Sequence, residues 1–153
     1  MKKIISILLV IGTLFMFTGC SKEANLTQTT SEIVTAMYEG FAAEELPMMI
    51  EQRELTTEEL EYALGLIELN FVEGTISEPM ITSSAHSVVV VRVAKDVDVE
   101  KAKTDIKANV NPSKWLCVTA ESVLVESKGD VIVLVMSSNE TAPKLMENFK
   151  NLK

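Results

Sequence analysis

The stretch VIVLVM at residues 131–136 holds six consecutive apolar residues, four of which are β-branched. β-Branched side chains favour strands, and a strand that is apolar on both faces is normally covered on both sides. The sequence therefore predicts a central strand over 131–137, with helices or another layer covering it. Immediately before it, Lys128-Gly129-Asp130 has the composition of a tight turn, which makes residues 121–127 the other arm of a hairpin.

A second aliphatic run, VVVV at residues 88–91, lies within a predicted strand over 85–93. Successive side chains of a strand point to opposite faces. We expect the odd-numbered valines of this strand to face the core. The even-numbered residues, which include His86 and Arg92, share a face that is only partly apolar.

Apolar residues at helical spacing predict four helices. Two of them begin at capping boxes, Thr29-Thr30-Ser31-Glu32 and Thr56-Thr57-Glu58-Glu59. A third begins at Asp98 and ends before Pro112, because the residue before a proline disfavours helical geometry. The expected elements are helices over 31–44, 57–66, 98–110 and from 139 onward, and strands over 71–77, 85–93, 121–127 and 131–137.

The resulting order, α-α-β-β-α-β-β-α, predicts an α+β fold. Strands linked by hairpins pair antiparallel, so we expect a mostly antiparallel sheet of about four strands. Helices are expected to pack on one face of this sheet. No internal repeat or low-complexity segment interrupts the pattern.

The first residues have the pattern of a signal peptide. Met1-Lys2-Lys3 is positively charged, and residues 4–17 are nearly all apolar. A run of this length suits the apolar region of a signal peptide, whereas a helix that spans a bilayer needs about 20 apolar residues. We therefore expect the segment to direct export.

The predicted signal peptide ends in Phe17-Thr18-Gly19-Cys20. Small residues followed by cysteine resemble the bacterial lipobox, in which the cysteine receives a diacylglyceryl group and becomes the first mature residue. Two or three acyl chains would give a stable membrane anchor, where a single chain is marginal. The alternative is an ordinary secretory signal that contains a cysteine.

These features predict a signal peptide at 1–19, a lipid anchor and flexible tether at 20–30, and a single α+β domain at 31–153. The lipid-attachment residue would be Cys20, and the protein would lie on the extracytoplasmic face of a bacterial cell membrane. Cleavage would remove Lys2 and Lys3 and change the net charge from −8 to −10. An acidic chain lacks the basic surface expected of a nucleic-acid-binding protein, so we expect no nucleic-acid partner.

Three segments carry a resemblance to a known family: ITSSAHSVVVVRV at 81–93, DVDVEKAK at 96–103, and the hairpin around 128–130 with the strand after it. Together with the lipobox, they resemble the bacterial lipoprotein family catalogued as domain of unknown function 4358. The resemblance covers about residues 46–149 and implies an exported α+β lipoprotein. It implies no activity, because none is assigned to that family.

The candidate residues for catalysis or metal binding are few. His86 is the only histidine, which excludes a site rich in histidine, and Cys117 is the only cysteine besides Cys20. We expect both to be structural; the alternatives are a ligand or catalytic role for His86 and a nucleophilic thiol at Cys117. No glycine-rich phosphate loop, nucleophile elbow or Cys-x-x-Cys pair occurs. We therefore predict no catalytic, cofactor or metal site.

Residues 21–78 hold 13 acidic and 2 basic residues. The glutamates at 44–45 and at 58, 59 and 61 are expected to be solvated helix residues; the alternative is a surface for a cation or a partner. They lack the spacing of an EF-hand loop. Met48-Met49 between the first two helices is expected to be core, with an exposed contact point as the alternative.

Location and composition together predict a binding or interaction module at the bacterial cell envelope, not an enzyme. Its membrane contact would be the lipid on Cys20, and a protein at the envelope would be its partner. The alternative is an accessory subunit of an envelope enzyme or transporter complex.

Overall fold

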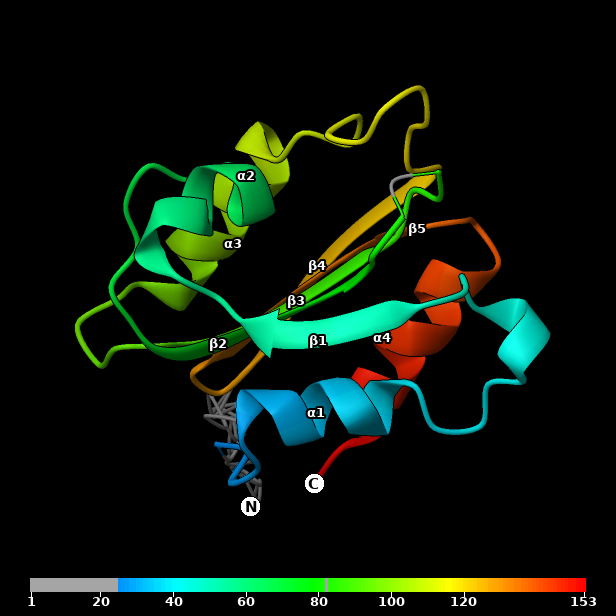
Figure 1. Cartoon of the computed structure of the whole chain (residues 1–153). Coiled ribbons are helices and arrows are strands. Elements are labelled where there is room, and N and C mark those ends of the chain that lie inside the picture. Colours follow the sequence, from blue (N-terminus) through cyan, green and yellow to red (C-terminus); the bar gives the residue numbers. More distant parts are fainter. Residues whose placement is uncertain (1–24, 82) are drawn as a thin grey trace, which may run out of the picture.

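The two aliphatic runs lie side by side at the centre of a five-stranded antiparallel sheet (Figure 1). β5 (Val131–Ser137) pairs with β3 (Ser87–Val93) on one side and with β4 (Ser122–Lys128) on the other. The strand order is β1-β2-β3-β5-β4. The computed structural model describes residues 25–81 and 83–153.

The sheet has one strand more than the four that the sequence predicts. β1 (Ile50–Glu54) pairs antiparallel with β2 (Phe71–Pro79) and forms one edge of the sheet. Its sequence, IEQRE, has a single apolar residue, because an exposed edge strand needs no buried face. The expected α+β class is confirmed, but the order becomes α-β-α-β-β-α-β-β-α.

The helices of the predicted order are present with shorter ranges than expected. They are α1 (Thr30–Met37), α2 (Leu60–Leu64), α3 (Val99–Asn109) and α4 (Thr141–Asn151), with single 3₁₀ turns at Ala43–Glu45 and Thr57–Glu59. The capping box at Thr29 is confirmed, since Thr29 Oγ1 accepts from the Glu32 amide and the Glu32 carboxylate accepts from the Thr29 amide. Among the described residues, no helix is both long enough and apolar enough to cross a membrane.

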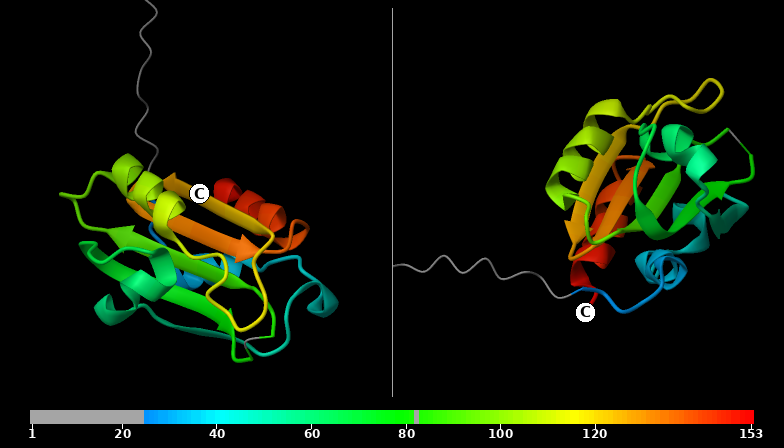
Figure 2. Two further views of the ribbon diagram at one scale, coloured as in Figure 1. Left: turned by 90° about the horizontal axis from the view of Figure 1, so that it is seen from above. Right: turned by 90° about the vertical axis from the view of Figure 1, so that its left-hand side faces the viewer.

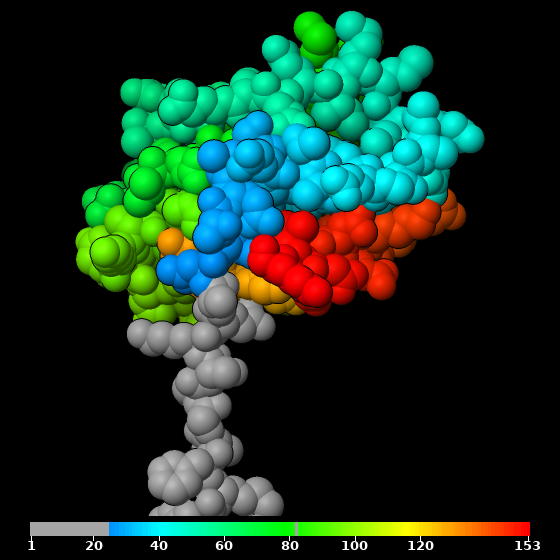
Figure 3. Space-filling view, turned by 90° about the horizontal axis from the view of Figure 1, so that it is seen from below, coloured from blue at the N-terminus to red at the C-terminus, as the bar shows by residue number. Residues whose placement is uncertain are grey.

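Helices cover both faces of the sheet, and the expectation of a single covered face is therefore wrong (Figure 2). α2 and α3 pack on the face that carries Val89, Val91 and the even-numbered residues of β5. α1 and α4 lie side by side on the opposite face, which carries Val88 and Val90 (Figure 3). Two apolar layers explain why 131–136 has no polar position, and the predicted central strand is confirmed.

The described part of the predicted tether, residues 25–30, belongs to the fold. Leu26 is buried in the layer under α1 and α4. The Arg92 guanidinium donates to the backbone carbonyls of Leu26 and Gln28 and forms ion pairs with Glu73 and Asp130. A flexible segment over the whole of 20–30 is therefore wrong for its second half. The predicted signal peptide and Cys20 lie outside the described residues.

Gly65 ends α2 in the left-handed conformation, with φ of 71°, close to the end that the sequence predicts. A Cβ at this position would lie 2.4 Å from the Asn109 backbone carbon. We expect Gly65→Ala to lower the free energy of unfolding by about 2 kcal/mol, because it adds this collision to the cost of left-handed backbone. The matched control is Gly40→Ala, where φ is 78° but nothing lies within 4 Å. Urea unfolding should show the larger loss at Gly65; equal losses would contradict the role of the close approach.

Candidate functional site

Three loops meet at one end of the sheet, which we call the loop end: residues 42–49, residues 80–81 with 83–86, and residues 110–121. They adjoin the start of β1, the end of β2, and the starts of β3 and β4. A shallow hollow of about 420 Å³ is lined by residues of all three, among them Leu46, Ser84 and Val118. Asn25, the first described residue, lies at the opposite end of the sheet, where it adjoins Gly129 of the β4–β5 turn.

His86 is buried beneath the loop end, with none of its surface exposed. Its Nε2 lies 2.8 Å from the Tyr38 hydroxyl oxygen, and its Nδ1 lies 2.9 Å from Ser137 Oγ. The Tyr38 hydroxyl also lies 3.0 Å from Ser77 Oγ. Side chains of β2, β5, the β2–β3 loop and the residue that follows α1 are thereby joined into one buried hydrogen-bond chain.

Burial lowers the pKa of His86 to about 4, against a smaller opposite effect of the Glu78 charge. Burial also raises the pKa of Tyr38 to about 12. Both rings are therefore neutral at pH 7. A neutral histidine has one donor and one acceptor nitrogen, which matches its two hydroxyl neighbours. This geometry supports the expected structural role for His86.

Lys114 contacts Glu78 and Ser87, the residues that follow Ser77 and His86, and is the most buried lysine side chain in the described ion pairs, with 3% of it exposed. Its Nζ lies 2.6 Å from Glu78 Oε1 and donates to Ser87 Oγ at 3.2 Å. The rings of Tyr62 and Trp115 flank the ammonium, with Nζ at 4.3 and 5.3 Å from their centroids. Burial lowers the pKa of Lys114, and the Glu78 carboxylate opposes that effect. This set of contacts holds the 110–121 loop on the sheet.

Large apolar side chains are exposed on the loop end above these buried groups. They are Met48, Met49, Met80, Ile81 and Leu116, with exposed fractions between 52% and 82%. The Met80 amide donates to the Met49 carbonyl at 2.9 Å, so the two methionine-bearing loops are joined. The prediction that Met48-Met49 is core is wrong, because β1 begins only at Ile50 and leaves both side chains outside the two apolar layers.

Cys117 lies in the same end and is exposed, in a left-handed backbone conformation with φ of 64°. Two of the glutamates noted in the sequence serve local structure. Glu45 forms an ion pair with Lys144, and Glu59 forms one with Arg53 and caps the turn that precedes α2. Within residues 25–81 and 83–153, no three His, Cys, Asp or Glu side chains are close enough to share a metal ion.

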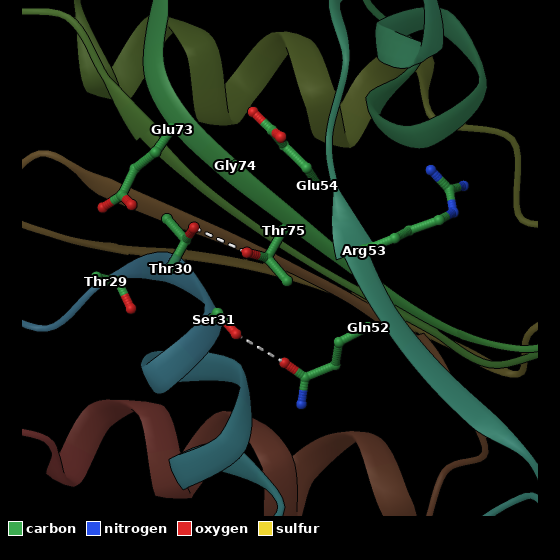
Figure 4. Close-up of a pocket in the computed structure, with 9 residues that line it drawn as sticks. All are labelled: Thr29, Thr30, Ser31, Gln52, Arg53, Glu54, Glu73, Gly74 and Thr75. Atoms are coloured by element: carbon green, nitrogen blue, oxygen red, sulfur yellow. Dashed lines mark hydrogen bonds between the residues drawn. The ribbon is translucent and has the colours of Figure 1, made fainter.

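A second, polar hollow of about 300 Å³ lies between the start of α1 and the β1–β2 pair (Figure 4). Ser31 Oγ donates to Gln52 Oε1 at 3.2 Å, and Thr30 and Thr75 share a buried hydroxyl contact of 2.8 Å. The first bond joins α1 to β1, and the second joins α1 to β2. The side chain of Arg53 points to the other side of β1, toward Glu59.

Searches against models of protein families, curated proteins and solved structures found no match for this chain. The loop-end groups are therefore known only from their own geometry. Sequence reasoning identified His86 but missed Tyr38, Ser77 and Ser137 as its neighbours, and it missed the Lys114–Glu78 pair. Hydroxyl residues at the termini of neighbouring strands were the one available signal, and it is weak.

Proposed function

We propose that this chain is a lipid-anchored extracytoplasmic protein that binds a partner protein at the bacterial cell envelope through its loop end. The observation that supports the binding role is that the loops of this one end expose five large apolar side chains, Met48, Met49, Met80, Ile81 and Leu116. Apolar side chains grouped on a surface mark interaction sites, whereas single exposed ones need no explanation. Methionine adapts to the shape of a partner because its side chain is unbranched and flexible.

The buried groups give this surface a rigid base. The Lys114–Glu78 pair and the hydrogen bonds of His86 tie the loops to β2, β3 and β5. A surface that is already ordered loses little conformational entropy when it binds. The loop end also lies about 20 Å, the length of a seven-residue strand, from the end where Asn25 enters the fold. A chain anchored at Cys20 would thus leave the loop end free for an envelope protein.

A photo-crosslinking amino acid at Leu116 tests the binding role in bacterial cells that express the full chain. We expect a specific adduct at Leu116 and none at Ile67, which is 91% exposed but lies at the other end of β2. Met80→Glu should abolish the adduct, because it places a charge in the apolar surface. If the adduct is a subunit of a membrane enzyme or transporter, the chain is an accessory subunit. Adducts of equal yield at both positions would contradict a binding loop end.

The anchor rests on the Phe17-Thr18-Gly19-Cys20 pattern and has its own test. Cys20→Ala should abolish the mature, membrane-bound form of the protein, because the variant lacks the sulfur that would carry the lipid. Cys117→Ala, the other cysteine, should leave membrane attachment unchanged. Mass spectrometry of the wild-type N-terminal peptide should find a lipid on Cys20. A free, unmodified Cys20 in the secreted fraction would contradict the anchor.

A further inference from the structure

The edge strand β1 presents unused backbone hydrogen-bonding groups. Leu55 N–H donates to the Gly74 carbonyl, and Met80 N–H donates to the Met49 carbonyl, both at 2.9 Å. In an antiparallel ladder, alternate residues direct both backbone groups to the same neighbour. The odd-numbered residues from 49 to 55 therefore face β2, and the N–H and C=O groups of Ile50, Gln52 and Glu54 point away from the sheet. Among the described residues, no strand pairs with that side of β1.

The charges of β1 are complementary to those of a second copy of itself. When two β1 strands pair antiparallel about a twofold axis at Gln52, Glu51 of each copy lies opposite Arg53 of the other. The two residues share one face of the strand, as the alternation of Gln52 and Arg53 in Figure 4 shows. Centring the axis at Glu51 or Arg53 would instead oppose two like charges.

The backbone selects the same register. With the axis at Gln52, the outward N–H and C=O groups of Gln52 lie opposite those of Gln52 in the other copy. The outward groups of Ile50 lie opposite those of Glu54 in the other copy. About six backbone hydrogen bonds can then form. Glu51 and Arg53 then occupy positions that are not hydrogen-bonded, where opposed side chains lie closest. Backbone and charge therefore agree on one arrangement.

We propose that the protein forms a symmetric dimer through antiparallel pairing of β1 with β1 of a second copy, centred on Gln52. The pairing joins two sheets into one of ten strands. Because the axis is normal to the sheet, the faces that carry α1 stay on one side, and both chains enter the fold on that side. Two copies can therefore be held by one membrane. This inference does not depend on the partner proposed for the loop end.

Disulfide trapping identifies which residues of the two β1 strands lie opposite each other. The experiment uses the full chain in mild detergent, with Cys117→Ser as the background variant. In the proposed dimer the two Gln52 Cα atoms lie about 5.5 Å apart, a distance that a disulfide can span. Gln52→Cys should give a crosslinked dimer under mild oxidation, whereas Glu51→Cys and Arg53→Cys should give little. The background protein without a new cysteine is the control. Crosslinking through Val125→Cys on the opposite edge strand, β4, in place of Gln52→Cys would overturn the proposal.

Sedimentation of the full chain measures the charge complementarity. Glu51→Arg places arginines opposite each other twice per dimer, and we expect the dissociation constant to rise at least about tenfold. The double change Glu51→Arg with Arg53→Glu restores the opposite charges and should restore the dimer. Glu51 is exposed, so the single variant should fold as the wild type does. A wild-type chain that stays monomeric at its solubility limit, or a dimer that Glu51→Arg leaves intact, would overturn the proposal.

Discussion

Glu78→Gln is expected to lower the free energy of unfolding by about 3–5 kcal/mol, because it leaves the buried Lys114 ammonium without its partner, and Lys114→Met by less, because Arg53 Nη2 still lies 3.9 Å from Glu78 Oε2. The Lys114 side chain is 3% exposed, and Glu78 supplies its counter-charge at 2.6 Å. With 3% of the Lys114 side chain and 13% of the Glu78 side chain exposed, water replaces the lost partner only in part. The remaining charge then favours drawing the 110–121 loop away from the sheet, where water can reach it.

Urea unfolding of both single variants and the double variant measures this effect. The double variant should lose less than the two singles together, since removing both charges leaves none buried alone. Lys101→Ala is the matched control, because it removes a lysine from an exposed ion pair with Asp105, and it should leave stability unchanged within error. Additive losses in the double variant would contradict a coupled buried pair.

The same variants distinguish a local displacement of the 110–121 loop from unfolding of the whole domain. Trp115 follows Lys114 and is buried, so its fluorescence reports whether the 110–121 loop stays on the sheet. A variant that still unfolds cooperatively but has an exposed tryptophan, and that loses the crosslink at Leu116, would link the ion pair to the proposed binding surface.

The central part of the fold could be predicted because its sequence signals are local. The run at 131–136 and the turn at Lys128-Gly129-Asp130 specify a hairpin without reference to the rest of the chain. The edge strand β1 could not be predicted this way. Its exposed residues carry no alternation, and it becomes a strand only because β2 offers a pairing edge. The second helical layer was not predicted because one face of β3 is partly polar in the sequence. Its polar residues are His86, just before the strand, and Arg92, near the end of the strand, and the residues between them on that face are apolar.

Those two residues also show why the candidate site could not be predicted from the sequence. The sequence predicts that His86 and Arg92 lie on a partly polar strand face. In the structure, partners that are distant in sequence bury His86 and half-bury Arg92. Tyr38 and Ser137 lie 48 and 51 residues from His86. No spacing rule relates them, since only the sheet register and the position of α1 bring them together. Exposure of Met48 and Met49 likewise depends on where β1 begins.

The neutral state of His86 makes the stability of the fold depend on pH. Its pKa is lowered by burial from 6.5 to about 4, so the unfolded chain binds a proton more readily than the folded one. The contribution is complete above pH 6.5 and is lost as the pH falls from about 6.5 to 4. Over that range we expect the free energy of unfolding to drop by about 3 kcal/mol, at 1.36 kcal/mol per pKa unit.

His86→Gln should remove most of this pH dependence, because glutamine does not titrate. Carboxylates with a lowered pKa, such as Glu45 beside Lys144, add a loss in the same direction, but only below their unfolded pKa of about 4.5. Urea unfolding between pH 7 and 5 therefore isolates the histidine. Since His86 is the only histidine of the chain, its ring resonances in NMR spectra can be assigned without ambiguity. A ring that titrates near 6.5 in the folded protein would show that water reaches it, and the buried chain from Tyr38 to Ser137 could not then be intact in solution.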